Sequence, residues 1–172
     1  MPDNIRINNL ALKPYSDGDQ AAMIELLTNE KIKETFMIPD FNTEDEAICM
    51  FKKLQTFSHS EDHYERGLYI EQQLIGFLND VEIMDKKIEL GYVIHPLYQN
   101  KGYATQALRE AIKDLFQKGY NEIITCAFAN NAASFRVMEK CGMTRIEKQE
   151  YIHYHNVARL CYYYAIRKAD QL

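Results

Sequence analysis

The sequence of 172 residues contains no tryptophan, only seven glycines and four prolines, and no excess of positive charge. With 47% hydrophobic residues, this composition excludes collagen, a coiled coil and a disordered chain, and the length suits one domain spanning residues 1–172. The 25 acidic and 20 basic residues give a net charge of -5, with no cluster of Lys and Arg. Because binding along nucleic acid needs a basic face, no nucleic acid is expected as a ligand.

Long hydrophobic runs are also absent. No apolar segment approaches the ~20 residues that span a bilayer, so no membrane partner is expected. The Met-Pro-Asp-Asn start lacks the basic and then apolar order of a signal peptide. We therefore expect a cytoplasmic protein.

Closely spaced metal ligands are a third absence. The four cysteines form no C-x-x-C pair, so we expect neither a disulfide framework nor a zinc knuckle, but four buried or partly buried free thiols. These cysteines are Cys49, Cys126, Cys141 and Cys161. His153 and His155 would share one face of a strand, but no third ligand is apparent and no metal is expected.

The first third of the chain predicts one strand and two helices. Leu10 and Leu12 alternate with polar residues, and helical spacing of apolar residues begins at 19 or 20. Thr43 and Glu46 have the spacing of a capping box at the start of a second helix. A loop around residues 37–40 separates the two helices.

The remainder alternates between strands and helices. We predict three antiparallel strands within residues 64–92, a helix from Gly102 to about residue 117, a strand over 122–128 and a helix over 132–140 that ends at Gly142. Two strands near 143–151 and 160–166 follow. The last has apolar or aromatic side chains on both faces, which predicts a place inside the sheet. The expected element order is βααβββαβαββ.

The segment from Glu89 to Thr105 is predicted to be a strand that turns through a glycine-containing loop into a helix start. Backbone N–H groups and the positive end of the helix dipole converge at such a start, which suits a pyrophosphate. Gly102 permits close approach of the backbone, and Ala104 keeps the next turn small. By itself, the spacing Gln99-x-x-Gly102-x-Ala104 also fits an ordinary helix start.

Gln99-Asn-Lys-Gly-Tyr-Ala104 resembles the motif with which the GNAT superfamily of acyl-CoA-dependent N-acyltransferases binds the CoA pyrophosphate, Arg/Gln-x-x-Gly-x-Gly/Ala. Asn131-Ala-Ala-Ser134-Phe-Arg-Val-Met-Glu-Lys-Cys-Gly-Met143 is similar to a segment of the branch that contains ribosomal-protein-alanine N-acetyltransferases. The two motifs have the expected separation, and the resemblance covers nearly the whole chain. It implies the GNAT fold of the α/β class: a mixed, mostly antiparallel central sheet flanked by helices, with a splayed strand pair that holds CoA.

The resemblance also implies a site for acetyl-CoA as co-substrate. The backbone of Tyr92, Val93 and Ile94 would hold the pantetheine arm as an extra strand. Asn131 would hydrogen-bond the CoA arm, and the same side chain is also suited to cap the following helix. Lys101 would add positive charge to the loop that holds the pyrophosphate. The residues of that loop are Gln99, Asn100, Lys101, Gly102, Tyr103, Ala104 and Thr105.

Attack of a neutral amine on a thioester requires a base, donors for the oxyanion and an acid for the departing thiolate. In the wider superfamily that acid is often a tyrosine seven residues after the asparagine, but this chain has Met138 there, which has no proton to donate. In the resembling branch a serine three residues after the asparagine is proposed instead. We therefore expect Ser134 to protonate the thiolate, directly or through water; the alternative is a helix-surface serine bonded to backbone.

Two residues are candidates for the base. Glu89 lies in the strand where several GNAT enzymes carry a base that works through water, and partial desolvation would raise the pKa of its carboxyl group. The alternative for Glu89 is an exposed carboxylate paired with Lys86 or Lys87. His95 is the rival because an imidazole can act as a base near neutral pH, but a histidine before proline at a strand end commonly has a capping or loop role. We favour Glu89.

Two further positions bear on the reaction. Cys126 lies in the strand expected near the thioester, but it has no patterned His or Asp partner and is expected to be a small core residue. The resembling branch carries an Asp near the start of the last strand, where this chain has Arg159. The acceptor preference of the branch therefore does not transfer directly.

The sequence thus predicts an N-acetyltransferase that transfers the acetyl group of acetyl-CoA to a primary amine by direct attack in a ternary complex. The acceptor is a protein N-terminal amine or a small-molecule amine. Two alternatives stay open. One is a non-catalytic acyl-CoA-binding regulatory module that has lost turnover. The other is a structural component of a homodimer that pairs through the Tyr-rich last strand.

Overall fold

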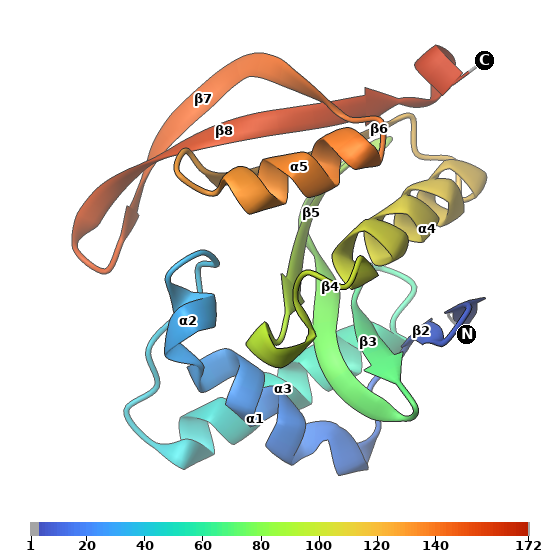
Figure 1. Cartoon of the computed structure of the whole chain (residues 1–172). Helices are drawn as coiled ribbons and strands as arrows, with labels where there is room; N and C mark the ends of the chain where they lie inside the picture. The colour runs from blue at the N-terminus through green and yellow to red at the C-terminus, as the bar shows by residue number, and fades with distance from the viewer. Residues whose placement is uncertain (1–3, 172) are drawn as a thin grey trace. The chain divides into compact units, whose positions relative to one another are not determined.

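The computed structural model describes residues 4–171 as a chain of alternating strands and helices (Figure 1). The strands are Ile5–Ile7 (β1), Leu10–Lys13 (β2), Arg66–Ile70 (β3), Gln73–Met84 (β4), Lys87–Ile94 (β5), Glu122–Phe128 (β6), Thr144–Tyr154 (β7) and Val157–Arg167 (β8). The α-helices are Gln20–Thr28 (α1), Glu30–Lys33 (α2), Glu44–His59 (α3), Tyr103–Gln117 (α4) and Ala132–Lys140 (α5). Short 3-10 helices are Asp17–Asp19 (η1), Pro96–Tyr98 (η2) and Lys168–Gln171 (η3).

Hydrogen bonds connect the eight strands in the order β1-β2-β3-β4-β5-β6-β8-β7. β5 and β6 are parallel, whereas β1 with β2, β2 with β3, β3 with β4, β6 with β8 and β7 with β8 are antiparallel. The mixed, mostly antiparallel sheet is therefore confirmed. So is the interior position of the last strand, since β8 lies between β6 and β7.

Besides the 3-10 helices, the sequence pattern missed a short strand and a short α-helix. β1 has three residues and turns into β2 through Asn8, whose φ of 53° is left-handed. α2 has four residues and begins at Asn29, whose side chain accepts hydrogen bonds from the N–H groups of Lys31 and Ile32. Neither element is long enough to show a hydrophobic period. β7 and β8 are longer than predicted because their pairing continues through polar residues.

Contacts divide the chain into two compact units. We call Met1–Asn79 with Tyr92–Ala107 the first unit, and Asp80–Gly91 with Leu108–Leu172 the second unit. Within residues 4–171, no helix has the length and apolar character that crossing a membrane requires.

The first unit has its core between helices and sheet. α1 and α3 lie side by side (Figure 1), and their buried residues Met23 and Phe51 join Tyr69 and Phe77 of the strands in one cluster. α3 begins as predicted, because Thr43 Oγ1 accepts a hydrogen bond from the Glu46 N–H. The reciprocal half of the capping box differs, since Glu46 Oε2 accepts from the N–H of Asn42.

The second unit has different packing on the two faces of β6 and β8. α5 lies along β8 (Figure 1), where Phe135 stacks on Tyr164 with ring centroids 5.2 Å apart. α5 ends as predicted at Gly142, which has a φ of 84°. Because side chains alternate along a strand, the opposite face carries a second cluster. Its members are Ile124, Phe128, Tyr154, Cys161, Tyr163 and Ala165, with Cys126, Ile146 and Ile152 packed against them.

Candidate active site

The predicted pyrophosphate loop lies in the first unit, at the start of α4. Asn100 and Gly102 have φ values of 60° and 82°, so the chain makes two left-handed turns there. A Cβ at Gly102 would meet only Gln106 Nε2, at 3.7 Å, and the glycine is favoured because of the left-handed φ. The N–H groups at the start of a helix point outward along its axis. The loop therefore presents backbone donors in the manner that an anion requires.

Two side chains support this loop. Gln99 Nε2 donates a hydrogen bond of 2.9 Å to the carbonyl of Ile94, which ties the loop to the end of β5. Lys101 Nζ lies 5.5 Å from the ring centroid of Tyr98 and keeps a positive charge on the loop. Gln99, the first residue of the motif, thus has a structural function that the sequence pattern did not indicate.

The end of β5 approaches β4 closely. A Cβ at Gly76 would lie 2.1 Å from the carbonyl oxygen of Val93, so only glycine fits at this position of β4. The ladder between β5 and β6 runs from Lys87 and Glu122 to Leu90 and Thr125. Tyr92, Val93 and Ile94 follow the last residue pair of this ladder, although both strands continue.

Asn131 and Ser134 lie together at the start of α5 in the second unit. Asn131 Oδ1 accepts a hydrogen bond of 3.2 Å from the Ser134 N–H, so Asn131 is the N-cap of this helix. Ser134 is partly buried in the first turn. Met138 is fully buried, so the position that often carries an acidic tyrosine belongs here to the hydrophobic core.

Glu89 is a buried carboxylate on β5 and does not lie in the exposed position that pairing with a neighbouring lysine would require. Its residue is 6% exposed, and Lys87 pairs instead with Glu122, at 3.2 Å. The alternative of an exposed Glu89 paired with a neighbouring lysine is therefore wrong. Burial raises the pKa of the Glu89 carboxyl group, while a hydrogen bond from Cys126 and the charge of Lys148 lower it.

Cys126 is the direct partner of Glu89. Its Sγ donates a hydrogen bond to Glu89 Oε1 over 3.4 Å. Burial, and then the neighbouring Glu89 carboxylate, raise the pKa of the thiol far above its ordinary value. The thiol therefore stays protonated and acts as a donor, which agrees with the prediction that Cys126 is not a nucleophile.

Two charged side chains of β7 and a tyrosine of β8 extend this group on the same face. Tyr163 donates a hydrogen bond of 2.8 Å to Glu150 Oε2, and Lys148 Nζ lies 3.7 Å from Glu150 Oε1. Sequence reasoning missed these residues. The alternation of Cys161 and Tyr163 in the last strand was the available signal, but nothing local showed that this face is the one with Glu89.

His95 lies in the first unit and makes two hydrogen bonds with its ring. Nδ1 accepts from the Leu97 N–H at 3.2 Å, and Nε2 lies 2.7 Å from Oε1 of Glu25. Because Nδ1 is the acceptor, Nε2 carries the proton and donates to Glu25. The neutral ring then has no lone pair left for a proton from a substrate. Glu25 is 70 residues away in sequence and could not be assigned to His95 by a motif.

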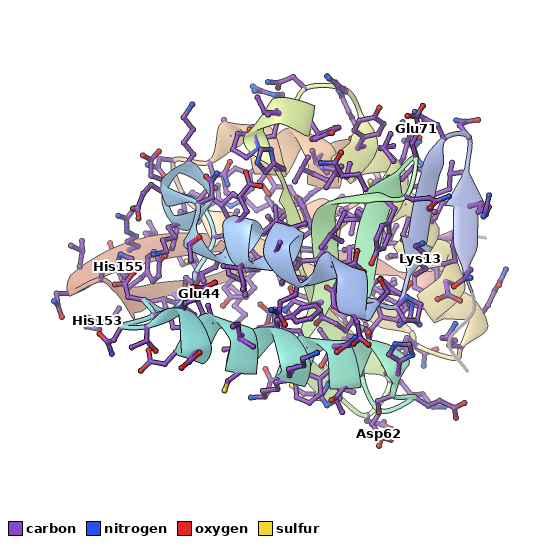
Figure 2. All side chains as sticks on the ribbon, turned by 90° about the horizontal axis from the view of Figure 1, so that it is seen from below. Lys13, Glu44, Asp62, Glu71, His153 and His155 are labelled. Carbon is purple, nitrogen blue, oxygen red and sulfur yellow. The ribbon has the colours of Figure 1, made fainter. Side chains whose placement is uncertain are left out.

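The remaining sequence candidates lie elsewhere. Figure 2 shows His153 and His155 at the tip of the β7–β8 hairpin. His155 is in the turn, with a φ of 50°, and its ring stacks on Tyr154, so the expectation that both histidines share a strand face is wrong. No group of three metal-binding side chains occurs within residues 4–171. All four cysteines are free thiols, and Cys49 is exposed, contrary to the prediction.

The units divide the predicted site residues into two sets. The first unit holds the backbone at Tyr92–Ile94, His95 and the loop of residues 99–105. The second unit holds Glu89, Cys126 and the helix start with Asn131 and Ser134. Glu89 and Ile94 belong to the same strand, β5, so one strand carries both the candidate base and the predicted pantetheine contact.

Comparison with known proteins identifies the family. The family model described as Acetyltransferase (GNAT) domain matches residues 9–144. The chain belongs to the GNAT acetyltransferase family. This acetyltransferase is 41% identical over 145 residues to the uncharacterized N-acetyltransferase YnaD of Bacillus subtilis, and the match covers 83% of each protein. The GNAT fold predicted from the sequence is thereby confirmed, and the protein is an acyl-CoA-dependent N-acetyltransferase.

Solved structures of similar fold support the same assignment. A GNAT-family acetyltransferase from Bacillus anthracis has a TM-score of 0.82 and 26% identity, with 97% of this acetyltransferase and 99% of that chain covered. RimL, a ribosomal protein acetyltransferase in complex with coenzyme A, has a TM-score of 0.83 and 16% identity, with 96% and 98% covered. At this low sequence identity, the similarity to RimL shows only that the two proteins share a fold.

Proposed function

We propose that this chain transfers the acetyl group of acetyl-CoA to a primary amine by direct attack in a ternary complex, with residues 1–172 acting as one catalytic domain. The observation that carries the proposal is the buried carboxylate of Glu89 on β5. A carboxyl group whose pKa is raised by burial is a better base near neutral pH than an ordinary surface carboxylate.

Acetyl-CoA would bind along the end of β5 and at the start of α4. The backbone of Tyr92, Val93 and Ile94, past the last residue pair with β6, would hold the pantetheine arm. The left-handed turns at Asn100 and Gly102 would direct N–H groups of the loop toward the pyrophosphate, and Lys101 would add its charge. The coenzyme A in RimL supports this assignment through the shared fold.

Proton transfer would use two side chains. Glu89 would accept the proton of the ammonium group, through water, so that the neutral amine can attack the thioester carbonyl. Ser134, in the first turn of α5, would donate a proton to the departing thiolate, directly or through water. Asn131, whose Oδ1 caps the helix, retains its amide N–H groups as donors for the CoA arm.

The acceptor would be a protein N-terminal amine or a small-molecule amine. The similarity of the Asn131–Met143 segment to the ribosomal-protein branch supports the first class. We place the reaction in the cytoplasm, without nucleic acid, membrane or metal as a partner. A homodimer through the last strand would be compatible with this chemistry.

Calorimetric titration of acetyl-CoA into wild type, Gly102→Glu and Gly119→Glu tests the cofactor assignment. Both glycines have a left-handed φ, of 82° and 98°, so both variants carry a similar backbone cost at opposite ends of α4. We expect micromolar binding by wild type and Gly119→Glu, and no binding by folded Gly102→Glu. Absence of binding by wild type contradicts the proposal, as does equal binding by all three proteins.

Release of free CoA thiol in the presence of primary amines tests turnover. An acetyl-CoA-binding wild type that releases thiol only when an amine is present, and yields the acetylated amine by mass spectrometry, supports transfer. A wild type that binds acetyl-CoA but acetylates no amine is the outcome expected of a regulatory module.

A further inference from the structure

Arg159 occupies an unusual environment on β8. Its guanidinium carbon lies 5.1 Å from the ring centroid of Phe128 and 5.9 Å from that of Tyr154. The side chain is half-buried between two elements, the end of β6 and the end of β7. Two aromatic faces hold the cation in place, which limits the entropy that a ligand contact would cost.

The guanidinium group of Arg159 is not fully satisfied. Its Nε is buried and has no hydrogen-bond partner within residues 4–171. In the same part of the chain, Arg159 forms no salt bridge with a carboxylate. A half-buried cation with a buried, unpaired N–H is costly, and an anion that accepts this hydrogen bond removes the cost.

Arg159 lies on the same face of the sheet as the candidate base. Phe128, beneath Arg159, belongs to the cluster that includes Cys161 and Tyr163, and Cys126 packs against that cluster. α5 covers the opposite face. Cys126, which donates to Glu89, and Phe128 are two residues apart on β6, a separation of about 7 Å along the strand.

We propose that Arg159 binds an anionic group of the acceptor, so that the substrates are primary amines that also carry a carboxylate or a phosphate. The inference rests on the proposed function, because it takes Glu89 as the site of the reacting amine. Cys126, the partner of Glu89, and Phe128, over which Arg159 lies, are neighbours on one face of β6, so an amine at Glu89 and an anionic group at Arg159 can belong to one small molecule or peptide terminus. The positive charge of Arg159 disfavours acceptors with a second cationic group at this position.

The first test uses the Nε–H signal of Arg159 in ¹H–¹⁵N spectra, assigned by its loss in Arg159→Gln. Inorganic phosphate and acetate are added separately to the protein saturated with acetyl-CoA, and chloride at the same ionic strength is the control. We expect one of the two oxyanions to move the signal downfield, because the Nε–H then donates a hydrogen bond. A signal that responds to neither oxyanion more than to chloride overturns the proposal.

The second test compares acceptors that differ only at the end remote from the amine. Ethanolamine has a hydroxyl group, β-alanine a carboxylate and phosphoethanolamine a phosphate, so the carboxylate and phosphate arms separate the two anions. A pair of dipeptide amides with Glu or Gln as the second residue extends the comparison to N-terminal amines. Each is assayed by thiol release with wild type, Arg159→Gln and Arg145→Gln.

Arg145 provides the matched control. Its guanidinium carbon lies 3.7 Å from the ring centroid of Tyr162 on β8, so Arg145, like Arg159, is stacked on an aromatic ring. Tyr162 and Tyr164 lie on the face that α5 covers, however, and not on the face with Glu89. Arg145→Gln therefore removes a comparable charge and stacking contact away from the expected acceptor.

We expect wild type to prefer an anionic acceptor over its uncharged counterpart. Arg159→Gln should reduce this ratio of kcat/KM about tenfold or more, whereas Arg145→Gln should leave it unchanged. Equal use of both acceptors by wild type, or a preference that survives in folded Arg159→Gln, overturns the inference alone. A wild type that acetylates no amine overturns the proposed function instead, and the spectra of Arg159 then still decide whether an anion binds there.

Discussion

Cys126 donates a hydrogen bond to Oε1 of Glu89 over 3.4 Å, so a protonated thiol on β6 holds the buried carboxylate on β5. This bond lowers the pKa of Glu89, against the larger effect of burial, which raises it. Lys148 lowers the same pKa, and Glu82 and Glu150 raise it. The thiol therefore favours the ionised form of the candidate base.

Replacement of Cys126 by Ala should shift the acid limb of the kcat/KM profile to higher pH. The sign follows because the base must be ionised, and loss of the donor favours its protonated form. Cys126→Ser keeps a donor and should restore most of the wild-type profile. Cys161→Ala is the control, since this buried thiol donates its hydrogen bond to the Arg159 carbonyl and not to Glu89. Superimposable profiles of wild type and Cys126→Ala would show that the thiol does not influence the base.

Glu89→Gln should reduce kcat by a factor of about 10² to 10⁴, the usual contribution of a general base. The melting temperature at pH 7 should not fall. Burial raises the folded-state pKa of Glu89 above the ordinary pKa of a glutamate. As the pH rises from the ordinary pKa through the raised one, ionisation of Glu89 destabilises the fold, and Gln avoids that cost. Below the ordinary pKa of a glutamate the two proteins should be equally stable.

Glu122→Gln is the matched control for this substitution. Glu122 is also a buried carboxylate in the same ladder, but it pairs with Lys87 and Arg167. Its loss should lower stability and leave kcat nearly unchanged. Retention of full activity in Glu89→Gln would remove this residue from the mechanism.

His95→Asn should retain kcat within about threefold. The Asn side-chain oxygen can replace Nδ1 as acceptor for the Leu97 N–H, and it cannot act as a base near neutral pH. The measurement is kcat of wild type and His95→Asn, determined by steady-state kinetics between about pH 5 and 9. Loss of a limb of the profile together with a large decrease in kcat would identify His95 as the base, with the Glu25 contact rearranged in the complex.

Ser134→Ala should lower kcat by at least about tenfold with little change in the KM for acetyl-CoA. The reason is that the hydroxyl would act on the departing thiolate and not on the bound ground state. Ser134→Thr keeps the hydroxyl and should retain more activity than Ser134→Ala. Unchanged turnover in Ser134→Ala would leave the serine as a helix residue without a chemical role.

Local signals in the sequence predicted several elements to the residue. The strand over 122–128 and the helix over 132–140 have the predicted bounds, and the helix does so because its ends, Asn131 and Gly142, are set by local chemistry. Gly102 was likewise recognisable, since a left-handed φ of 82° excludes most other residues. The family resemblance, and the fold class that it implies, followed from Gln99–Ala104 and Asn131–Met143.

Contacts between residues far apart in the sequence decided the environments of Glu89, His95 and Arg159, which the sequence pattern left open. Burial of Glu89 depends on β6, β7 and β8, which follow it by more than thirty residues, so no window around β5 could distinguish a buried base from a surface carboxylate. The pairing of Glu25 with His95 has the same origin. Arg159 was visible as a departure from the family pattern, but its unpaired Nε depends on the tertiary packing of Phe128 and Tyr154.

The sequence by itself therefore determined most of the elements, the glycine-containing loop before α4 and the family, because caps, glycine conformations and side-chain periodicity act between residues close in the chain. Only the tertiary structure decided the protonation properties of Glu89 and Cys126 and the environment of Arg159. The energy of a charge depends on everything within a few ångströms of it, and in a sheet most of those neighbours come from distant parts of the chain.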